Sequence, residues 1–258
     1  MTSPTQRDHL VGRQLLLRTF TSPGSGAMTF VLVHGIGMSH RYLARLHHSL
    51  TGSGTVISVD LPGFGGLPKP GRDVDIGEMA DALGSLLDTI GTGPVVLVGQ
   101  SMGTQWVLEL AARRPDLVQA VVLIGPVADE RRRTVLQQAG LLALDTLREP
   151  PGANALVFAD YLRCGPFWYL TQLHHMLGYR MEDRIGGVGA PVLVVRGSSD
   201  PIASRSWCRH LRAAAPSAGL VEIPGRAHNA QHTAPGAVAS AVRHFCSVHL
   251  PAREGGEG

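Results

Sequence analysis

The segment Gly99-Gln100-Ser101-Met102-Gly103 sets a serine between two glycines in the pattern Gly-x-Ser-x-Gly. An apolar run over 95–98 precedes it and an amphipathic stretch follows, which predicts a sharp turn from a strand into a helix. Only small neighbours let a strand and a helix approach closely at such a turn. The turn would expose the Ser101 hydroxyl beside helix N–H groups that favour developing negative charge, so Ser101 is the candidate nucleophile. The alternative is a plain turn in which Ser101 is a helix N-cap.

A serine hydroxyl is a poor nucleophile until a base removes its proton. Among the 12 histidines, His228 is favoured because it follows the last predicted strand at its carboxyl end. His232 raises the alternative of a metal site, but the chain has no HExxH pattern and no clear third ligand, so no metal is expected. The adjacent pairs His47-His48 and His174-His175 lie in predicted helices and are interpreted as packing or surface residues.

The base needs a carboxylate that fixes its tautomer and stabilises the imidazolium formed during the reaction. Asp200 fits this role, because a predicted strand over 192–196 leads into a short loop that ends at Asp200-Pro201. The alternative is a turn or N-cap aspartate before the proline, and Asp129 is the reserve candidate for the acid.

A tetrahedral intermediate requires at least two hydrogen-bond donors aimed at its oxyanion. The backbone N–H of Met102, next to the nucleophile, is one candidate. The backbone N–H of Ile36 is the second, because His34-Gly35-Ile36-Gly37 follows another predicted strand. A phosphate-binding loop is the alternative, but a third glycine at dinucleotide spacing and a Lys-Ser/Thr pair are both missing, and no cofactor is expected.

The elements that must position these residues alternate along the chain. Short apolar runs predict strands at 29–33, 55–60, 95–99, 121–124, 192–196 and 220–223, with an additional edge strand at 15–20. Amphipathic stretches predict helices at 41–50, 76–90, 102–114, 204–214 and 235–249. This alternation predicts the α/β class, with a mostly parallel sheet covered by helices on both faces. Ligands bind such sheets beyond the carboxyl ends of the strands, where all the candidate residues lie.

The interval 127–189 contains no convincing strand, only helical segments such as 131–148 and 166–177. It is too long for a simple loop and carries several aromatic residues, so we expect a helical cap over the strand ends. The predicted organisation is a core formed by 1–126 and 190–250, a cap at 127–189 and a flexible tail at 251–258.

The composition narrows the class of protein. The chain has 258 residues with a net charge of only +3, and its densest basic cluster, Arg131 to Arg133, is interpreted as a solvated helix face, so nucleic-acid binding is not expected. Three widely spaced cysteines (Cys164, Cys208 and Cys246) suit reduced thiols in a cytoplasmic protein. The polar N-terminus does not resemble a signal peptide, and no apolar stretch is long enough to span a membrane. The expected partner is a small-molecule substrate.

At this point the residues resemble the α/β-hydrolase superfamily. The matching blocks are His34 to Gly37, Asp60 to Gly65, Gly99 to Gly103 and the loops of Asp200 and His228, which together span 29–245. The chain order Ser101, Asp200, His228 is the order of that family. The likeness is closest to a capped subgroup of esterases, enol-lactone hydrolases, carbon–carbon bond hydrolases and cofactor-free haloperoxidase-like enzymes. In this resemblance Asp60 belongs to a structural loop, and a serine at 101 separates the chain from haloalkane dehalogenases and epoxide hydrolases.

The resemblance implies a serine hydrolase that cleaves a small hydrophobic carboxylic ester or lactone through an acyl-enzyme on Ser101. Asp200 and His228 complete the triad, the N–H groups of Ile36 and Met102 hold the oxyanion, and no cofactor takes part. Two alternatives stay open. A carbon–carbon bond hydrolase or a perhydrolase uses the same residues, and a ligand receptor can keep the pocket with little turnover.

Overall fold

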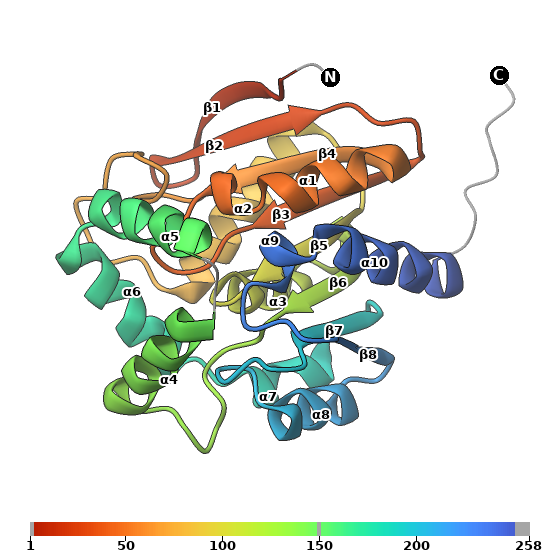
Figure 1. Ribbon diagram of the computed structural model, residues 1–258. Helices are drawn as coiled ribbons and strands as arrows, with labels where there is room; N and C mark the ends of the chain where they lie inside the picture. The colour runs from red at the N-terminus through yellow and green to blue at the C-terminus, as the bar shows by residue number, and fades with distance from the viewer. Residues whose placement is uncertain (1–2, 149–150, 251–258) are drawn as a thin grey trace, which may run out of the picture.

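A single sheet of eight strands, flanked by helices, organises the computed structural model, which describes residues 3–148 and 151–250 (Figure 1). The strand order is β1-β2-β4-β3-β5-β6-β7-β8, in which β1 and β2 are antiparallel to their neighbours and the other pairs are parallel. The predicted α/β class with a mostly parallel sheet is therefore confirmed. The strands are β1 (Thr5–Val11), β2 (Leu15–Ser22), β3 (Met28–Val33), β4 (Gly54–Asp60), β5 (Val95–Gln100), β6 (Val118–Ile124), β7 (Val192–Gly197) and β8 (Ala218–Ile223).

Alternation along each central strand divides the apolar side chains between the two faces of the sheet. In β3, Phe30 and Leu32 belong to one buried cluster, whereas Val31 and Val33 belong to the other. Burial on both faces is why these strands are continuous apolar runs rather than alternating ones.

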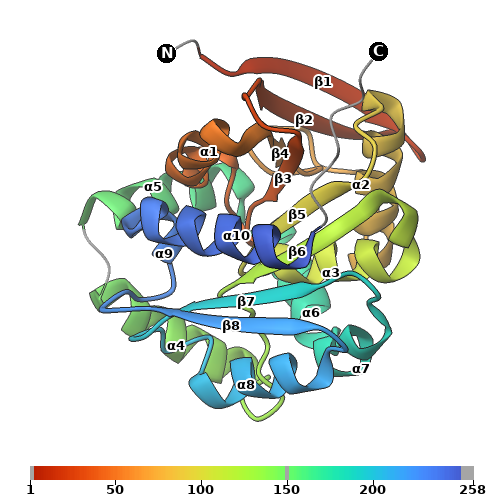
Figure 2. The ribbon, with the colours of Figure 1, turned by 90° about the vertical axis from the view of Figure 1, so that its right-hand side faces the viewer.

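The helices cover both faces. Helices α1 and α10 pack against each other on one face, where they lie side by side in Figure 2, while α2, α3 and α8 cover the other. The α-helices are α1 (Ala44–Leu50), α2 (Ile76–Ile90), α3 (Gly103–Arg113), α4 (Val135–Arg148), α5 (Pro151–Cys164), α6 (Pro166–Gly178), α7 (Met181–Arg184), α8 (Arg205–Ala214), α9 (Ala230–Thr233) and α10 (Pro235–His249).

Helices α4 to α7 lie between β6 and β7 in the chain, in the interval predicted to form a cap. In Figure 1, α4 to α6 lie to the left of the sheet, the side toward which the arrowheads of β3 and β4 point. Helix α4 begins at Val135 rather than at Arg131, because Thr134 and Gln137 form a reciprocal capping box at its start. Arg133 therefore precedes the helix, and its guanidinium pairs with Glu182 at 2.9 Å instead of forming part of a solvated helix face.

Another departure from prediction is at the sheet edge. The segment predicted as an edge strand is β2, which has neighbours on both sides, and β1 forms the edge outside it. Strand β1 is mostly exposed and polar, and an ion pair between Asp8 and Arg18 at 2.6 Å links it to β2. Polar residues on both faces give no hydrophobic periodicity, so the pattern of apolar residues could not reveal this strand. The tail predicted at 251–258 lies outside the described residues.

Candidate active site

Ser101 occupies the predicted turn between β5 and α3 with a left-handed backbone, φ +54°. Its N–H donates to the Ile124 carbonyl at 2.9 Å, which ties the turn to the neighbouring strand β6. A side chain at Gly99 would collide with the backbone of Gly103, and a Cβ at Gly103 would lie 2.5 Å from the Val33 carbonyl oxygen. Both glycines are thus required by the close approach of strand and helix. The N-cap position of α3 belongs to Met102, without a side-chain cap, so the structure gives Ser101 no capping role.

His228 and Asp200 form a buried pair with 2.9 Å between Nδ1 and Oδ2. The other carboxylate oxygen of Asp200 accepts the backbone N–H groups of Ile202 and Ala203 at 2.8 and 2.9 Å. Burial acts to raise the pKa of Asp200, but the attraction of His228 and these hydrogen bonds outweigh it and lower the pKa. Asp200 is therefore an ionised partner held in a fixed orientation.

The carboxylate of the reserve candidate, Asp129, has other partners. Its carboxylate accepts the Ser204 hydroxyl at 2.8 Å and the Arg131 backbone N–H at 3.1 Å. Of the two acids considered from the sequence, the structure thus brings only Asp200 to His228.

Gly125, at the end of β6, lies between the serine turn and the imidazole. A Cβ built on it would lie 2.8 Å from His228 Cε1 and 2.9 Å from Nδ1, and its own φ is +59°. The preceding residue, Ile124, accepts the Ser101 N–H. The imidazole and the serine backbone therefore meet at the same turn, and Ser101 and His228 line one cavity.

The loop after β3 supplies the first expected oxyanion donor. The N–H of Leu61 donates to His34 Nε2 at 3.2 Å, so the proton of this imidazole is on Nδ1, which donates to the Gly35 carbonyl at 2.8 Å. Burial lowers the pKa of His34, which keeps the ring neutral. Because the Gly35 carbonyl and the Ile36 N–H belong to one planar peptide, fixing the carbonyl fixes the direction of the N–H.

This loop lies directly against the nucleophile, since a Cβ on Gly35 would be 2.8 Å from Ser101 Cβ. Within residues 3–148 and 151–250, neither the Ile36 nor the Met102 N–H donates to another protein group. Both N–H groups can therefore donate to a ligand, as the prediction of an oxyanion site at these two residues requires.

Two buried carboxylates of the helices over the sheet were not predicted. Asp145 of α4 accepts the backbone N–H of His228 at 2.9 Å, and burial raises its pKa. Asp160 of α5 accepts the Ser39 hydroxyl at 2.6 Å, just after the Ile36 loop. Each helix therefore fixes one loop of the site. The only sequence signal was a carboxylate within a Leu-rich stretch, which does not identify its partner.

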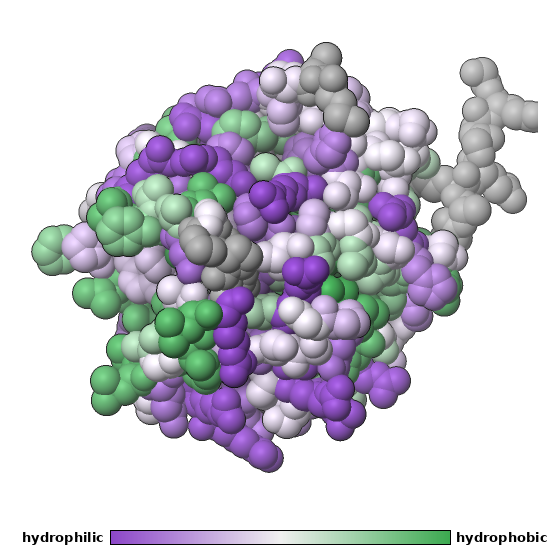
Figure 3. Space-filling model, viewed as in Figure 1, coloured by the Kyte–Doolittle hydropathy of each residue, from purple (hydrophilic) through white to green (hydrophobic). Residues whose placement is uncertain are grey.

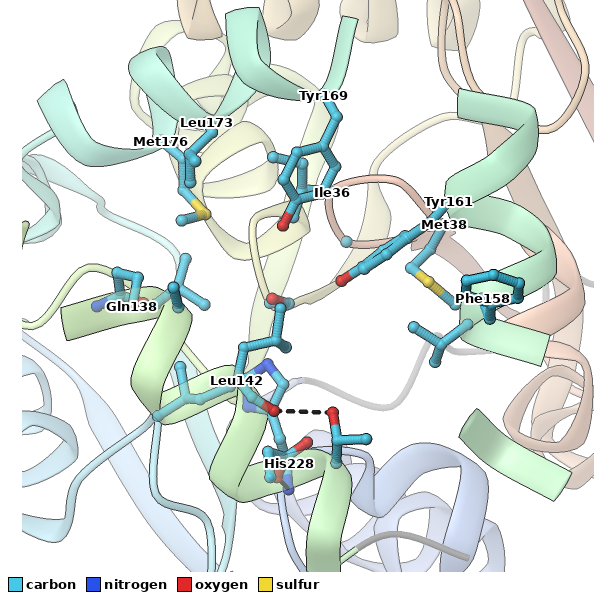
Figure 4. Close-up of a pocket in the computed structure, with 18 of the residues that line it drawn as sticks. Ile36, Met38, Gln138, Leu142, Phe158, Tyr161, Tyr169, Leu173, Met176 and His228 are labelled. Carbon is cyan, nitrogen blue, oxygen red and sulfur yellow. Dashed lines mark hydrogen bonds between the residues drawn. The ribbon is translucent and has the colours of Figure 1, made fainter. Parts of the chain in front are cut away.

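The cavity has a volume of about 700 Å³ and is enclosed by the core loops and helices α4 to α6. Figure 4 shows Gln138 and Leu142 of α4, Phe158 and Tyr161 of α5, and Tyr169, Leu173 and Met176 of α6 around it, with His228 at one side. The walls are mainly apolar. Green patches lie on the left of Figure 3, on the side where Figure 1 places α4 to α6. Large apolar side chains of these helices are exposed: Val135, Leu136, Leu144, Leu147, Phe158, Leu162, Phe167 and Leu170. Val135, Phe158 and Leu162 belong to both sets, so the apolar surface continues into the cavity.

The remaining predicted features are placed as follows. Cys164, Cys208 and Cys246 are buried free thiols. Asp60 accepts hydrogen bonds from the backbone N–H of His40 at 2.6 Å and from Nδ1 of its ring at 2.8 Å, in the structural loop where the resemblance put it.

His232 stacks on Tyr42, and the described part of the chain holds no group of three or more metal-ligating side chains. No described helix has the length and apolar character needed to cross a bilayer.

Comparison with known proteins gives a consistent family match. The model of the alpha/beta hydrolase family matches residues 30–241. The chain is 25% identical to 2-(acetamidomethylene)succinate hydrolase of Mesorhizobium japonicum, over 95% of this chain and 98% of that protein. It is 36% identical to lipase LipV of Mycobacterium tuberculosis over 51% of this chain and 50% of that protein. A solved thermophilic esterase from Thermogutta terrifontis has the same fold, with a TM-score of 0.79 at 21% identity, covering 95% of this chain and 100% of that one.

Proposed function

Because the chain belongs to the alpha/beta hydrolase family, we propose that it is a serine hydrolase that cleaves a small hydrophobic carboxylic ester or lactone through an acyl-enzyme on Ser101. One observation carries the proposal. The buried His228–Asp200 pair lies against Gly125, and the preceding residue, Ile124, accepts the Ser101 N–H with its carbonyl.

In the proposed mechanism, Ser101 Oγ attacks the scissile carbonyl carbon while its proton passes to His228 Nε2. Asp200 holds the imidazole by Nδ1 and stabilises the imidazolium. The negative charge on the former carbonyl oxygen is received by the N–H groups of Ile36 and Met102. His228 then gives the proton to the leaving alkoxide, and the acyl-enzyme forms. Water, deprotonated by the same imidazole, hydrolyses the acyl-enzyme and restores Ser101.

The apolar cavity supports a hydrophobic substrate, and the lipase and esterase among the relatives support ester chemistry. The Mesorhizobium relative is named for a derivative of succinate, a dicarboxylate, and the cavity of this chain does not favour a substrate of that charge. Among the described residues that line the cavity there is no lysine or arginine to pair with a carboxylate.

We also propose that residues 127–189 act as a helical cap over the strand ends, since Asp145 and Asp160 link its helices to the loops of the site. A cytoplasmic location is proposed from the three free thiols, which suit a reducing compartment.

The test is turnover of a panel that contains a short-chain ester, a lactone and a vinylogous diketone, so that ester, lactone and carbon–carbon cleavage are separated. Ser101→Ala should lower kcat on the preferred substrate by several orders of magnitude. The matched control is Ser85→Ala on α2, which removes a hydroxyl that hydrogen-bonds its own helix, to the Asp81 carbonyl. Undiminished ester turnover by Ser101→Ala would refute the proposal.

A further inference from the structure

Apart from the tyrosines, the only ionisable side chains among the described residues lining the cavity are Asp145 and His228. No lysine or arginine is present in this lining to compensate a negative charge. A substrate with a free carboxylate would have to lose its hydration without gaining a cationic partner, in a cavity that already contains one carboxylate. The charge distribution therefore favours an uncharged substrate.

Two tyrosines place polar groups in these otherwise apolar walls. Tyr161 of α5 and Tyr169 of α6 have ring centroids 5.1 Å apart. Both rings lie against the loop that carries Ile36, because a Cβ on Gly37 would be 2.5 Å from Tyr161 Cδ1 and 3.2 Å from Tyr169 Cδ2. Figure 4 shows both hydroxyl groups directed toward the centre of the cavity.

Burial raises the pKa of both phenols, and for Tyr161 the neighbouring Tyr169 adds to the rise. Both side chains are thus neutral hydroxyl donors across the pH range in which His228 would work as a base. A hydrogen bond between the two hydroxyls would use only one of their two protons, so the other can be donated to a ligand.

In an apolar cavity, a hydroxyl donor of this kind favours ligands that have an acceptor, because a ligand without one leaves the donor unpaired. We propose that Tyr161 and Tyr169 form a subsite for a second oxygen acceptor of the substrate, such as a ketone or ester carbonyl, on either side of the scissile bond. The substrate is then an uncharged, apolar ester or lactone with an additional acceptor, and free carboxylates are rejected. This inference rests on the proposed function, because it names the substrate class of the same site.

The first experiment compares matched methyl esters and matched acetates by proton release. The acyl series consists of hexanoate, its 4-oxo and 5-oxo derivatives, and the hemiester of glutaric acid. In the hemiester a carboxylate replaces the acetyl group of the 5-oxo compound. The alcohol series consists of acetates of pentanol and of hydroxy-ketones of the same length. We expect kcat/KM for the best oxo ester to exceed that of its hydrocarbon analogue at least tenfold, and that of the hemiester to be at least 100-fold lower than the best oxo ester.

The variants Tyr161→Phe, Tyr169→Phe and the double variant should bring the oxo-to-hydrocarbon ratio close to one. Tyr179→Phe is the matched control, because it removes a phenol hydroxyl that donates to Glu109 at 2.8 Å outside this cavity, and should leave the ratio as it is. An oxo-to-hydrocarbon ratio near one in the wild type for every compound overturns the subsite. So does a ratio that survives in the double variant, or a hemiester hydrolysed as fast as its oxo analogue.

A second measurement separates this inference from the proposed function. Binding of the same esters to the Ser101→Ala variant, followed by calorimetry, requires no turnover. If the wild type hydrolyses none of the esters but the variant binds the oxo compounds at least tenfold more tightly, the subsite is supported and the proposed function fails. Turnover that depends on Ser101, with no preference for oxo compounds in rate or in binding, overturns the subsite alone.

Discussion

Replacing Gly125 by alanine tests whether the position of the His228 ring controls the chemistry. The new Cβ would lie 2.8 Å from Cε1, whereas ordinary contacts begin at 3.4 Å, so the ring or the strand end must shift by about 0.6 Å. A misplacement of about 1 Å at a reacting group can cost about 100-fold in rate. We therefore expect kcat for ester hydrolysis to fall roughly 10-fold to 100-fold.

The same substitution also introduces backbone strain, which needs its own control. Gly125 has φ +59°, and an alanine in this region costs about 1–2 kcal/mol of stability. Gly91 at the end of α2 has φ +62°, and a Cβ there has no neighbour within 4 Å. Gly91→Ala should show a similar loss of stability with unchanged kcat.

The assay is steady-state hydrolysis of a p-nitrophenyl ester, with thermal unfolding of both variants measured in parallel. A Gly125→Ala enzyme with wild-type kcat would refute the assignment of His228 as the base. Equal losses of kcat in the two variants would show that strain alone, and not contact with the ring, is responsible.

Three further predictions follow from the same geometry. Asp200→Asn should lower kcat about 10⁴-fold with little change in KM, because the amide favours the wrong tautomer of His228; a loss below tenfold would contradict the assignment. Asp145→Asn keeps an acceptor for the backbone N–H of His228 but removes a negative charge near its imidazole. The imidazolium loses that stabilisation, so the acid limb of the kcat/KM profile should move to lower pH. An acid limb that does not move would contradict an electrostatic interaction between Asp145 and His228. Burial lowers the pKa of His47 to about 4, and its Nε2 has no partner among the described residues. The neutral ring therefore contributes fully above about pH 6.5, and up to about 3 kcal/mol of stability is lost as the pH falls toward 4. His47→Gln should flatten this part of the stability profile measured by urea unfolding, and an unchanged slope would contradict it.

The features that the sequence predicted correctly are those encoded locally. Helices α2 and α10 begin and end where their apolar periodicity indicated, because one stripe of side chains defines each. The turn at Ser101 was predictable because Gly99 and Gly103 flank it and a buried strand leads into it. Strand β1 was missed because its pairing with β2 depends on backbone hydrogen bonds and polar side chains rather than on a buried face.

The features that could not be predicted are contacts between segments far apart in the chain. Asp145 lies 83 positions from the His228 N–H that it accepts, and nothing near it in the sequence marks that partner. Nothing in the sequence distinguishes Gly125 from other glycines at strand ends, because its contact with the imidazole of His228 is formed only in the folded chain. The convergence of Tyr161 and Tyr169 on Gly37 likewise depends on how α5 and α6 pack over the sheet.

The central claim, that Ser101 is a hydroxyl activated by its neighbours, is tested most directly by covalent labelling with a fluorophosphonate. The intact mass of the wild-type chain should increase by one adduct, peptide mapping should place the adduct on Ser101, and Ser101→Ala should remain unlabelled. A wild-type chain that resists the reagent, or an adduct that forms equally in Ser101→Ala, would contradict the account.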